Sequence, residues 1–290
     1  MSETPRISVI IPHYNDFERL DRCLDALTRQ SLPVDQFEVI VADNMSSGGE
    51  SVVRRVINGR ALLAIAAARG AGPARNAGAA AARGPILAFT DSDCVPGPHW
   101  LAEGMAALAK RDFVGGRMTV LVPDERRMSG AEAFERVFAF NNERYVGQEH
   151  FTVTANLFCP RALFERVGGF RTEVSEDIEW CLRARDMGAR IGYAEKAVVG
   201  HPARADWPQL KKKWARMAAE NYQLSMSRGG TRAHWFLRCW ALLGSVVPHA
   251  LVVLRSPSIS GMGNRMAALG TLVRIRCWRF VEGHRLLFRS

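Results

Sequence analysis

Apolar runs alternate with helix-periodic segments through the first half of the chain. Four runs rich in β-branched and other apolar residues predict strands at residues 7–12, 37–42, 61–67 and 86–90. Apolar positions recur at helical spacing from Phe17 to Leu27, and residues 73–82 form an alanine-rich segment with a proline near its start. Strands that alternate with helices predict an α/β fold with a mostly parallel sheet, covered by helices on both faces.

The pattern is less regular after Lys110, and Gly229-Gly230 then separates the body from a C-terminal segment of different character. We predict further strands at 113–122, 153–159 and within 191–201, and helices at 177–187 and 209–225. The chain thus divides into a body with two parts, 1–122 and 123–228, and a helical extension at 229–290.

The basic charge is confined to the last third of the chain. Residues 201–290 carry 15 basic and 3 acidic side chains, a balance of +12, whereas the other 200 residues carry 24 and 26, a balance of −2. This asymmetry indicates a polyanionic partner, either anionic lipid headgroups or nucleic acid, and a solvated basic face is the alternative.

The cysteines and the N-terminus favour a cytoplasmic protein. The six cysteines are scattered and form no C-x-x-C pair, which argues against a zinc knuckle and against a disulfide framework. No basic n-region followed by an apolar stretch precedes the first predicted strand, so a secretory signal is not supported.

Polar clusters follow three of the predicted strands: His13-Tyr14-Asn15, Asp43-Asn44 and Asp91-Ser92-Asp93. In open α/β sheets, ligands bind at the carboxyl edge, where these clusters are expected to meet. Two carboxylates one residue apart, as in Asp91 and Asp93, suit a hard divalent cation that neutralises a diphosphate leaving group. A turn or a helix cap is the alternative reading of the D-x-D pattern.

The glycines at positions 70 and 72 lie where a strand gives way to a helix, and they partly match a dinucleotide-binding fingerprint. Arg75 occupies the place of the third glycine, and the segment follows the third predicted strand instead of the first. Both departures argue against NAD(P) binding.

Taken in order, these segments resemble the successive motifs of glycosyltransferase family 2. The matching N-terminal segments are Ser8–Asn15, Val39–Asn44, Ala74–Gly78 and Phe89–Asp93. Gly168-Gly169-Phe170 and Ser175–Arg183 resemble the acceptor-side segment of that family, so the likeness spans about residues 7–201 and leaves out the C-terminal 85 or so. The resemblance implies the GT-A fold, a Rossmann-like sheet flanked by helices, and an inverting enzyme of the hexosyltransferase type.

The resemblance also implies roles for individual positions. Pro12, Tyr14 and Asn15 line the nucleotide pocket, Asp43 holds the base, Arg75 lies beside the base or diphosphate, Asp91 and Ser92 approach the donor, and Asp91, Asp93 and His201 ligate Mn²⁺ or Mg²⁺. His201 is the weakest of these assignments, because a single histidine before a proline is often structural. His13 replaces the threonine that is usual in the family, which leaves the role of position 13 open.

Asp177 is the candidate general base. Inversion is a direct displacement, so a carboxylate opposite the departing diphosphate must take the proton of the acceptor hydroxyl. The alternative is that Glu176 and Asp177 only satisfy the start of a helix. Glu176 and Trp180 are candidates for acceptor or sugar contacts, although a core position suits Trp180 equally well. Glu179 and Arg183, four residues apart, predict a helical ion pair instead of a site.

Two segments of the extension predict association with a membrane. Residues 235–254 are strongly apolar but interrupted, so an interfacial or re-entrant helix fits better than a spanning one, and a packed hairpin is the alternative. Residues 273–290 predict a basic amphipathic helix of the kind that lies among anionic headgroups. Its apolar arc comprises Val273, Cys277, Phe280, Val281, Leu287 and Phe288, and its basic arc comprises Arg274, Arg276, Arg279, Arg285 and Arg289.

The function expected from the sequence is transfer of a sugar from a nucleotide diphosphate-sugar, with UDP favoured, to a saccharide or lipid-linked acceptor in cell-surface polysaccharide or glycolipid synthesis. The expected location is the inner face of the cytoplasmic membrane. A nucleotidyltransferase is disfavoured because no glycine-rich loop follows the first strand. A non-catalytic membrane or nucleic-acid binder is the other alternative; no nucleic-acid motif is present, so no such partner is expected. The sequence makes no prediction of oligomeric state.

Overall fold

The computed structural model describes residues 4–172 and 174–288. Within them the chain forms two compact units: unit 1 comprises residues 4–119, 141–172 and 176–201, and unit 2 comprises residues 120–140, 174–175 and 202–288. This division differs from the predicted boundary at residue 228, because residues 120–140 and the helix that starts at Trp207 pack with the C-terminal helices. Residues 1–3, 289 and 290, at the ends of the predicted domains, lie outside the described residues.

Unit 1 is built on a mixed sheet with the strand order β3-β2-β1-β4-β7-β6-β8-β5. The strands, of which β6 and β8 run slightly past the limits of the unit, are β1 Ile7–His13, β2 Phe37–Asp43, β3 Leu62–Ile65, β4 Ile86–Phe89, β5 Val95–Pro96, β6 Phe113–Leu121, β7 Leu157–Pro160 and β8 Ile191–Pro202. Strands β3, β2, β1 and β4 are parallel, whereas β4 pairs with β7, β7 with β6, and β5 with β8 in antiparallel fashion. The prediction of a mostly parallel sheet therefore describes only its N-terminal half.

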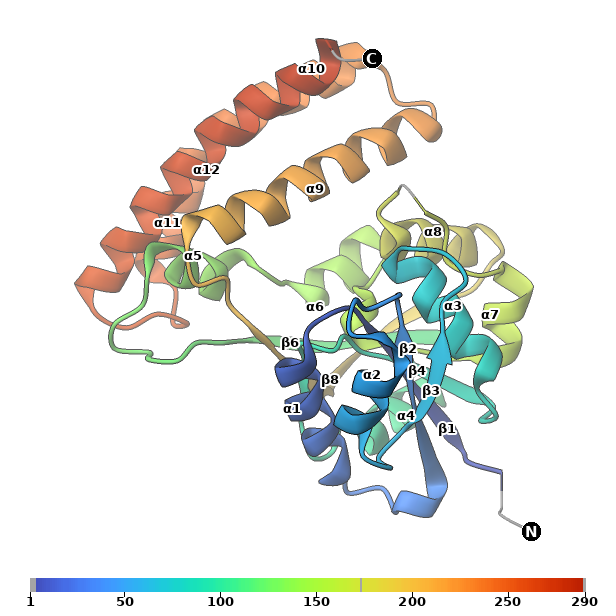
Figure 1. The fold of residues 1–290 in the computed structure, drawn as a ribbon. Helices are drawn as coiled ribbons and strands as arrows, with labels where there is room; N and C mark the ends of the chain where they lie inside the picture. The colour runs from blue at the N-terminus through green and yellow to red at the C-terminus, as the bar shows by residue number, and fades with distance from the viewer. Residues whose placement is uncertain (1–3, 173, 289–290) are drawn as a thin grey trace. The chain divides into compact units, whose positions relative to one another are not determined.

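Helices and short turns connect these strands (Figure 1). They are α1 Phe17–Thr28, α2 Gly49–Ile57, α3 Ala71–Ala81, α4 Trp100–Leu108, α6 Asn142–Arg144, α7 Arg161–Val167 and α8 Glu176–Asp186, with single turns η1 Val34–Gln36, η2 Tyr145–Glu149 and η3 Thr154–Asn156. The strand predicted from residue 153 begins instead with the 3₁₀ turn η3. Strand β1 is buried at all but one position, as its continuous apolar run predicts for a strand covered on both faces.

Helix α3 lies unusually close to the sheet, because glycine stands where it crosses β1. A Cβ atom on Gly78 would lie 2.6 Å from the Ile10 Cγ2 methyl and 3.3 Å from the Ala42 Cβ. The small side chains Ala74 and Ala79 are buried on the same helix. This close approach holds the first turns of α3, including Arg75, at the carboxyl edge of the parallel strands.

Unit 2 is helical, with a core of its own. Its helices are α5 Gly130–Phe138, α9 Trp207–Ser227, α10 Arg232–Gly244, α11 Val246–Arg255 and α12 Met262–Phe288. Helix α5 starts with a capping box between Ser129 and Glu132, and α9 starts with Asp206 as its cap. Glu135 of α5 is buried and accepts a bond of 2.6 Å from the Lys213 Nζ of α9, which ties the two helices together.

The amphipathic face predicted for residues 273–290 is partly wrong. In α12 the buried face comprises Ala268, Leu272, Ile275, Arg276 and Leu287. Val273, Cys277, Val281 and Phe288, four members of the predicted apolar arc, are instead exposed. The predicted arc takes no account of helices α5, α9 and α11, which share a core with Ile275, or of α10, which shares one with Leu287.

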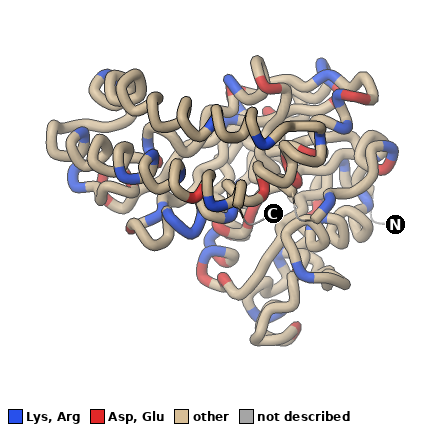
Figure 2. The backbone as a smooth tube through the Cα atoms, turned by 90° about the horizontal axis from the view of Figure 1, so that it is seen from above, with Lys and Arg blue, Asp and Glu red and all other residues tan. Residues whose placement is uncertain are grey.

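Three arginines of the predicted basic arc take part in the packing of unit 2, although Arg274 stays exposed. Arg274 and Arg279 each place the guanidinium carbon 4.0 Å from the centroid of a tryptophan ring of α9, Trp207 and Trp214 respectively. Arg276 is buried, and burial lowers its pKa. These cations therefore contribute to helix packing, and Arg289 lies outside the described residues. Figure 2 marks the positions of Lys and Arg in blue and of Asp and Glu in red along the backbone.

Candidate active site

The Asp91-Ser92-Asp93 loop leaves the carboxyl end of β4. Strand β4 runs parallel to β1, and the Thr90 amide donates to the Ile10 carbonyl at 3.2 Å, so the loop emerges at the edge of the sheet where β1 also ends. The Cys94 amide closes the loop by donating to the Asp91 carbonyl at 3.0 Å. Both carboxylates are partly buried, and together with the Cys94 sulfur they offer ligand atoms that lie within 4.8 Å of one another.

His201 reaches the same loop from the far end of the chain. Strand β5 pairs with β8 with Val95 opposite Gly200, which places the end of β8 beside the D-x-D loop. The His201 Nε2 lies 3.4 Å from the Asp93 Oδ2. The structure thus places His201 beside Asp93, whereas the ligand atoms that lie within 4.8 Å of one another are those of Asp91, Asp93 and Cys94.

The chemistry of this donor set fits a hard divalent cation. Burial, together with the charges of Asp93 and Asp91, raises the pKa of the Cys94 thiol well above its ordinary value, and a hard cation prefers oxygen ligands to sulfur. The remaining donors are carboxylate oxygens and an imidazole nitrogen, which suit Mn²⁺ or Mg²⁺ better than a thiophilic metal.

Arg75 joins the D-x-D loop to the start of α8. The Arg75 Nη2 donates to the Asp91 Oδ1 at 2.6 Å, and the Nη1 donates to the Glu176 Oε1 at 2.7 Å. The residue is only 3% exposed. Burial alone lowers the pKa of the guanidinium, but the charges of Asp91 and Glu176 outweigh burial and raise it, so the cation is held firmly.

Glu176 and Asp177 form the first turn of α8, where the helix N-terminus favours negative charge. The Asp177 Oδ1 accepts a bond of 2.8 Å from the Ile178 amide, and the side chain is partly buried. Through Glu176 and Arg75 the proposed base is linked to the D-x-D loop, 84 residues away from Asp93 in the sequence.

The predicted nucleotide-binding residues gather at the ends of β1 and β2. Asp43 is buried and accepts bonds from the His13 Nδ1 at 2.9 Å, the Ser46 amide at 2.9 Å and the Ser46 Oγ at 2.6 Å. Ser46 is a site residue that was not predicted from the sequence. The polar turn after Asp43 was the only sequence feature that pointed to it. His13, whose role the sequence left open, orients Asp43.

Pro12, Tyr14 and Asn15 continue this edge. The Tyr14 side chain is 50% exposed, although aromatic, and so is open to a planar ligand. Asn15 adopts a left-handed backbone with φ of 55°, and its Oδ1 accepts a bond of 2.8 Å from the Ser47 amide. This bond joins the loop after β1 to the loop after β2.

Trp180 is not available to a substrate. It is fully buried, its ring packs against Phe113, Phe164 and Phe170, and its Nε1 donates to the Gly168 carbonyl at 3.0 Å. The assignment of Trp180 to a sugar contact is therefore wrong, and the alternative of a core tryptophan is correct. The predicted ion pair is present, with the Arg183 Nε 2.8 Å from the Glu179 Oε1.

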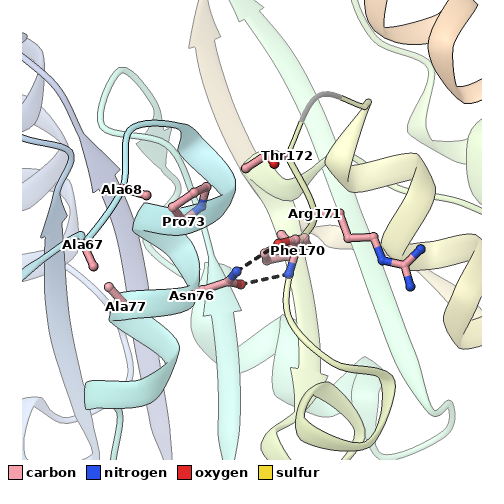
Figure 3. Close-up of a pocket in the computed structure, with 8 residues that line it drawn as sticks. All are labelled: Ala67, Ala68, Pro73, Asn76, Ala77, Phe170, Arg171 and Thr172. Atoms are coloured by element: carbon pink, nitrogen blue, oxygen red, sulfur yellow. Dashed lines mark hydrogen bonds between the residues drawn. The ribbon is translucent and has the colours of Figure 1, made fainter.

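A separate open cavity of about 560 Å³ lies beside α3, on the side of Asn76 (Figure 3). Its lining comprises Ala67, Ala68, Pro73, Asn76, Ala77, Phe170, Arg171 and Thr172. None of the predicted site residues is among these. The cavity lies where α3 meets residues 170–172, the segment that leads to α8.

Comparison with known sequences decides the family. The sequence model of the family described as "Glycosyl transferase family 2" matches residues 8–168. Glycosyltransferase AglE from Haloferax volcanii is 33% identical over 264 residues, which cover 86% of this chain and 85% of that protein. The chain belongs to glycosyltransferase family 2. It is therefore an enzyme, and the non-catalytic alternative falls away.

Other relatives match over a shorter stretch. Validoxylamine A glucosyltransferase from Streptomyces hygroscopicus is 37% identical over 112 residues, which cover 37% of this glycosyltransferase and 26% of that protein. This glycosyltransferase thus spans most of AglE but only about a quarter of the validoxylamine A enzyme.

Solved structures bear out the GT-A fold. The mannosyltransferase PcManGT from Pyrobaculum calidifontis, in complex with GDP-Man and Mn²⁺, has a TM-score of 0.62 at 22% identity and covers 100% of this glycosyltransferase and 89% of that chain. S. aureus TarS residues 1–349, in complex with UDP-GlcNAc, has a TM-score of 0.54 at 18% identity and covers 94% and 72% respectively. At these identities the likeness concerns the fold alone.

The donor set yields a prediction for Mn²⁺ binding, measured by titration calorimetry on the full chain. Replacing Asp93→Asn is expected to weaken Mn²⁺ binding by about 100-fold or more, because loss of an outer-shell partner alone typically costs roughly 10- to 100-fold. Cys94→Ser is the matched control and should leave the affinity nearly unchanged. An equal loss in both variants would contradict the assignment of the ligands.

Proposed function

We propose that this glycosyltransferase moves a sugar, with inversion, from a nucleotide diphosphate-sugar to a saccharide or lipid-linked acceptor in cell-surface polysaccharide or glycolipid synthesis. The observation that carries the proposal is the convergence of Asp91, Asp93 and His201 beside the Glu176-Asp177 pair, which Arg75 ties to them. UDP is the proposed nucleotide on the sequence resemblance; a structure of similar fold holds GDP-Man, so both nucleotides belong in the test.

The donor lies, in this proposal, along the carboxyl edge of β1, β2 and β4. Tyr14 and Asn15 contact the nucleoside, and Asp43, oriented by His13 and Ser46, receives the base. Asp91, Asp93 and His201 would hold Mn²⁺ or Mg²⁺, which when bound acts as a Lewis acid on the diphosphate. Ser92 lies between the two acids and faces the same donor.

Asp177 acts as the general base in the transfer step. The acceptor oxygen forms a bond to the anomeric carbon as the bond from that carbon to the diphosphate oxygen breaks. The proton of the acceptor hydroxyl passes to the Asp177 carboxylate, and the electron pair of the broken bond leaves with the nucleoside diphosphate. Glu176, paired with Arg75, lies beside it on the acceptor side.

We place the enzyme at the inner face of the cytoplasmic membrane, because unit 2 exposes a continuous apolar stripe. Leu237, Trp240, Val247 and Leu251 follow one another along α10 and α11 and are 65%, 52%, 72% and 50% exposed. Arg232, Arg238 and Arg255 flank this stripe. An exposed apolar stripe with basic flanks fits the headgroup region of an anionic bilayer, where a lipid-linked acceptor would lie.

The same helices do not meet the requirement for a single membrane-spanning segment. Among residues 4–172 and 174–288, no individual helix is both long and apolar enough to cross a bilayer, and α10 with α11 meets the criterion only as a pair bent by 43°. We therefore propose that this pair of helices lies in the membrane interface, which is one of the two placements predicted from the sequence.

The general base is tested by replacing Asp177→Asn. We expect a loss of kcat of about 100-fold or more, since general base catalysis contributes roughly 10²- to 10⁴-fold. The assay supplies UDP- and GDP-sugars with Mn²⁺ and short saccharide or polyprenyl-phosphate-linked acceptors. Asp186→Asn, at the exposed end of the same helix, should keep wild-type activity. Undiminished turnover by Asp177→Asn would remove Asp177 from the mechanism.

The membrane placement is tested by sedimentation of the full chain with phosphatidylcholine vesicles, with and without phosphatidylglycerol. Replacing Leu237→Glu and Leu251→Glu together should weaken binding on the order of 100-fold or more, because each buried leucine contributes about 1.5–3 kcal/mol. Val34→Glu with Leu62→Glu, at exposed apolar positions of unit 1, is the matched control. Equal binding by all three proteins, or none by the wild type, would contradict the placement.

A further inference from the structure

Two neighbouring residues of α3 hold the segment that leads into α8. The Asn76 Nδ2 donates to the Phe170 carbonyl at 2.9 Å, and the Phe170 amide donates to the Asn76 Oδ1 at 2.8 Å (Figure 3). The fit is close, since a Cβ atom on Gly169 would lie 2.6 Å from the same Oδ1. Asn76 therefore anchors the near end of this segment, because its side chain binds the backbone of Phe170.

Arg75 anchors the far end by its charge. Its two terminal nitrogens are each engaged by a different carboxylate, Asp91 in the D-x-D loop and Glu176 at the start of α8. Asn76 makes no such link to Asp91 among the bonds of the described residues. Arg75 and Asn76 therefore contact different parts of the structure. Of the two, only Arg75 contacts both the D-x-D loop and the start of α8.

We infer that Arg75 is a positioning residue, which fixes Asp177 relative to the D-x-D loop and does not itself bind the base or the diphosphate. This inference rests on the proposed glycosyl transfer. Glu176 and Asp177 share the first turn of α8, so the bond from Arg75 to Glu176 also fixes the position of Asp177. The bond to the Asp91 Oδ1 leaves the second oxygen of that carboxylate for the donor side.

Burial and geometry oppose a direct role in nucleotide binding. The side chain is almost inaccessible, and both of its terminal nitrogens already donate to a carboxylate. An arginine suits the positioning task because its planar fork holds two acceptors at a fixed separation, whereas the ammonium of a lysine is a single point charge. Arg75→Lys keeps the positive charge but removes the planar arrangement of two donors. It therefore tests the geometry of the two bonds separately from the charge.

The test compares the wild type with Arg75→Lys, Glu176→Gln and the double variant. We expect each single variant to lower kcat on the order of 100-fold, as a misplacement of about 1 Å does. The Kd of UDP and of GDP, measured by calorimetry without Mn²⁺, should change by less than about threefold. The double variant should resemble the single ones, because both remove one linkage. Asn76→Ala is the control for general loosening of the segment.

Hydrogen exchange gives a second readout that needs no substrate. Arg75→Lys should speed exchange at the amides of residues 178–181, and Asn76→Ala should do so at residues 169–171. The inference is overturned if Arg75→Lys weakens UDP and GDP binding in parallel with turnover, if the two single variants combine additively, or if exchange at residues 178–181 is unchanged. Absence of wild-type turnover with any nucleotide sugar would refute the proposed function alone, and hydrogen exchange and the binding constants would still decide the role of Arg75.

Discussion

A buried guanidinium between two carboxylates holds the two acidic motifs of this glycosyltransferase together. Asp91 and Glu176 are 85 residues apart in the sequence, but both contact the same guanidinium. Two carboxylates brought to one place would repel each other without a cation between them. Arg75 supplies that cation from α3, with bonds of 2.6 and 2.7 Å. Its place depends in turn on Gly78, which lets α3 approach β1, and hence on the sheet.

The two halves of the mixed sheet position different parts of the candidate site. The parallel half ends in the loops of His13, Asp43 and Asp91, where a nucleotide can lie across neighbouring strands. The antiparallel half returns the chain so that β8 pairs with β5 and delivers His201 to Asp93. In the proposed mechanism, an ion held there and the candidate base at the start of α8 would act on opposite sides of one reacting carbon.

The sequence predicted the features that depend on local pattern. Apolar runs located the parallel strands, and the polar residues after them located the carboxyl edge, because those signals lie within a few neighbouring positions. Long-range packing could not be predicted in this way. The partners of Arg75, the burial of Trp180 and the true buried face of α12 each depend on elements tens of residues away. The same holds for the division into units, since α9 packs with helices that follow it.

Paramagnetic broadening by bound Mn²⁺ tests the central claim most directly, because it reports distance from the ion in the intact protein. Backbone amide signals are recorded as Mn²⁺ is added at low molar ratio. The account predicts strong broadening at residues 91–94, at His201 and at residues 176–178 together, with little at the opposite ends of β1 and β2, about 20 Å along the strands. Broadening of residues 91–94 that leaves residues 176–178 sharp would contradict it.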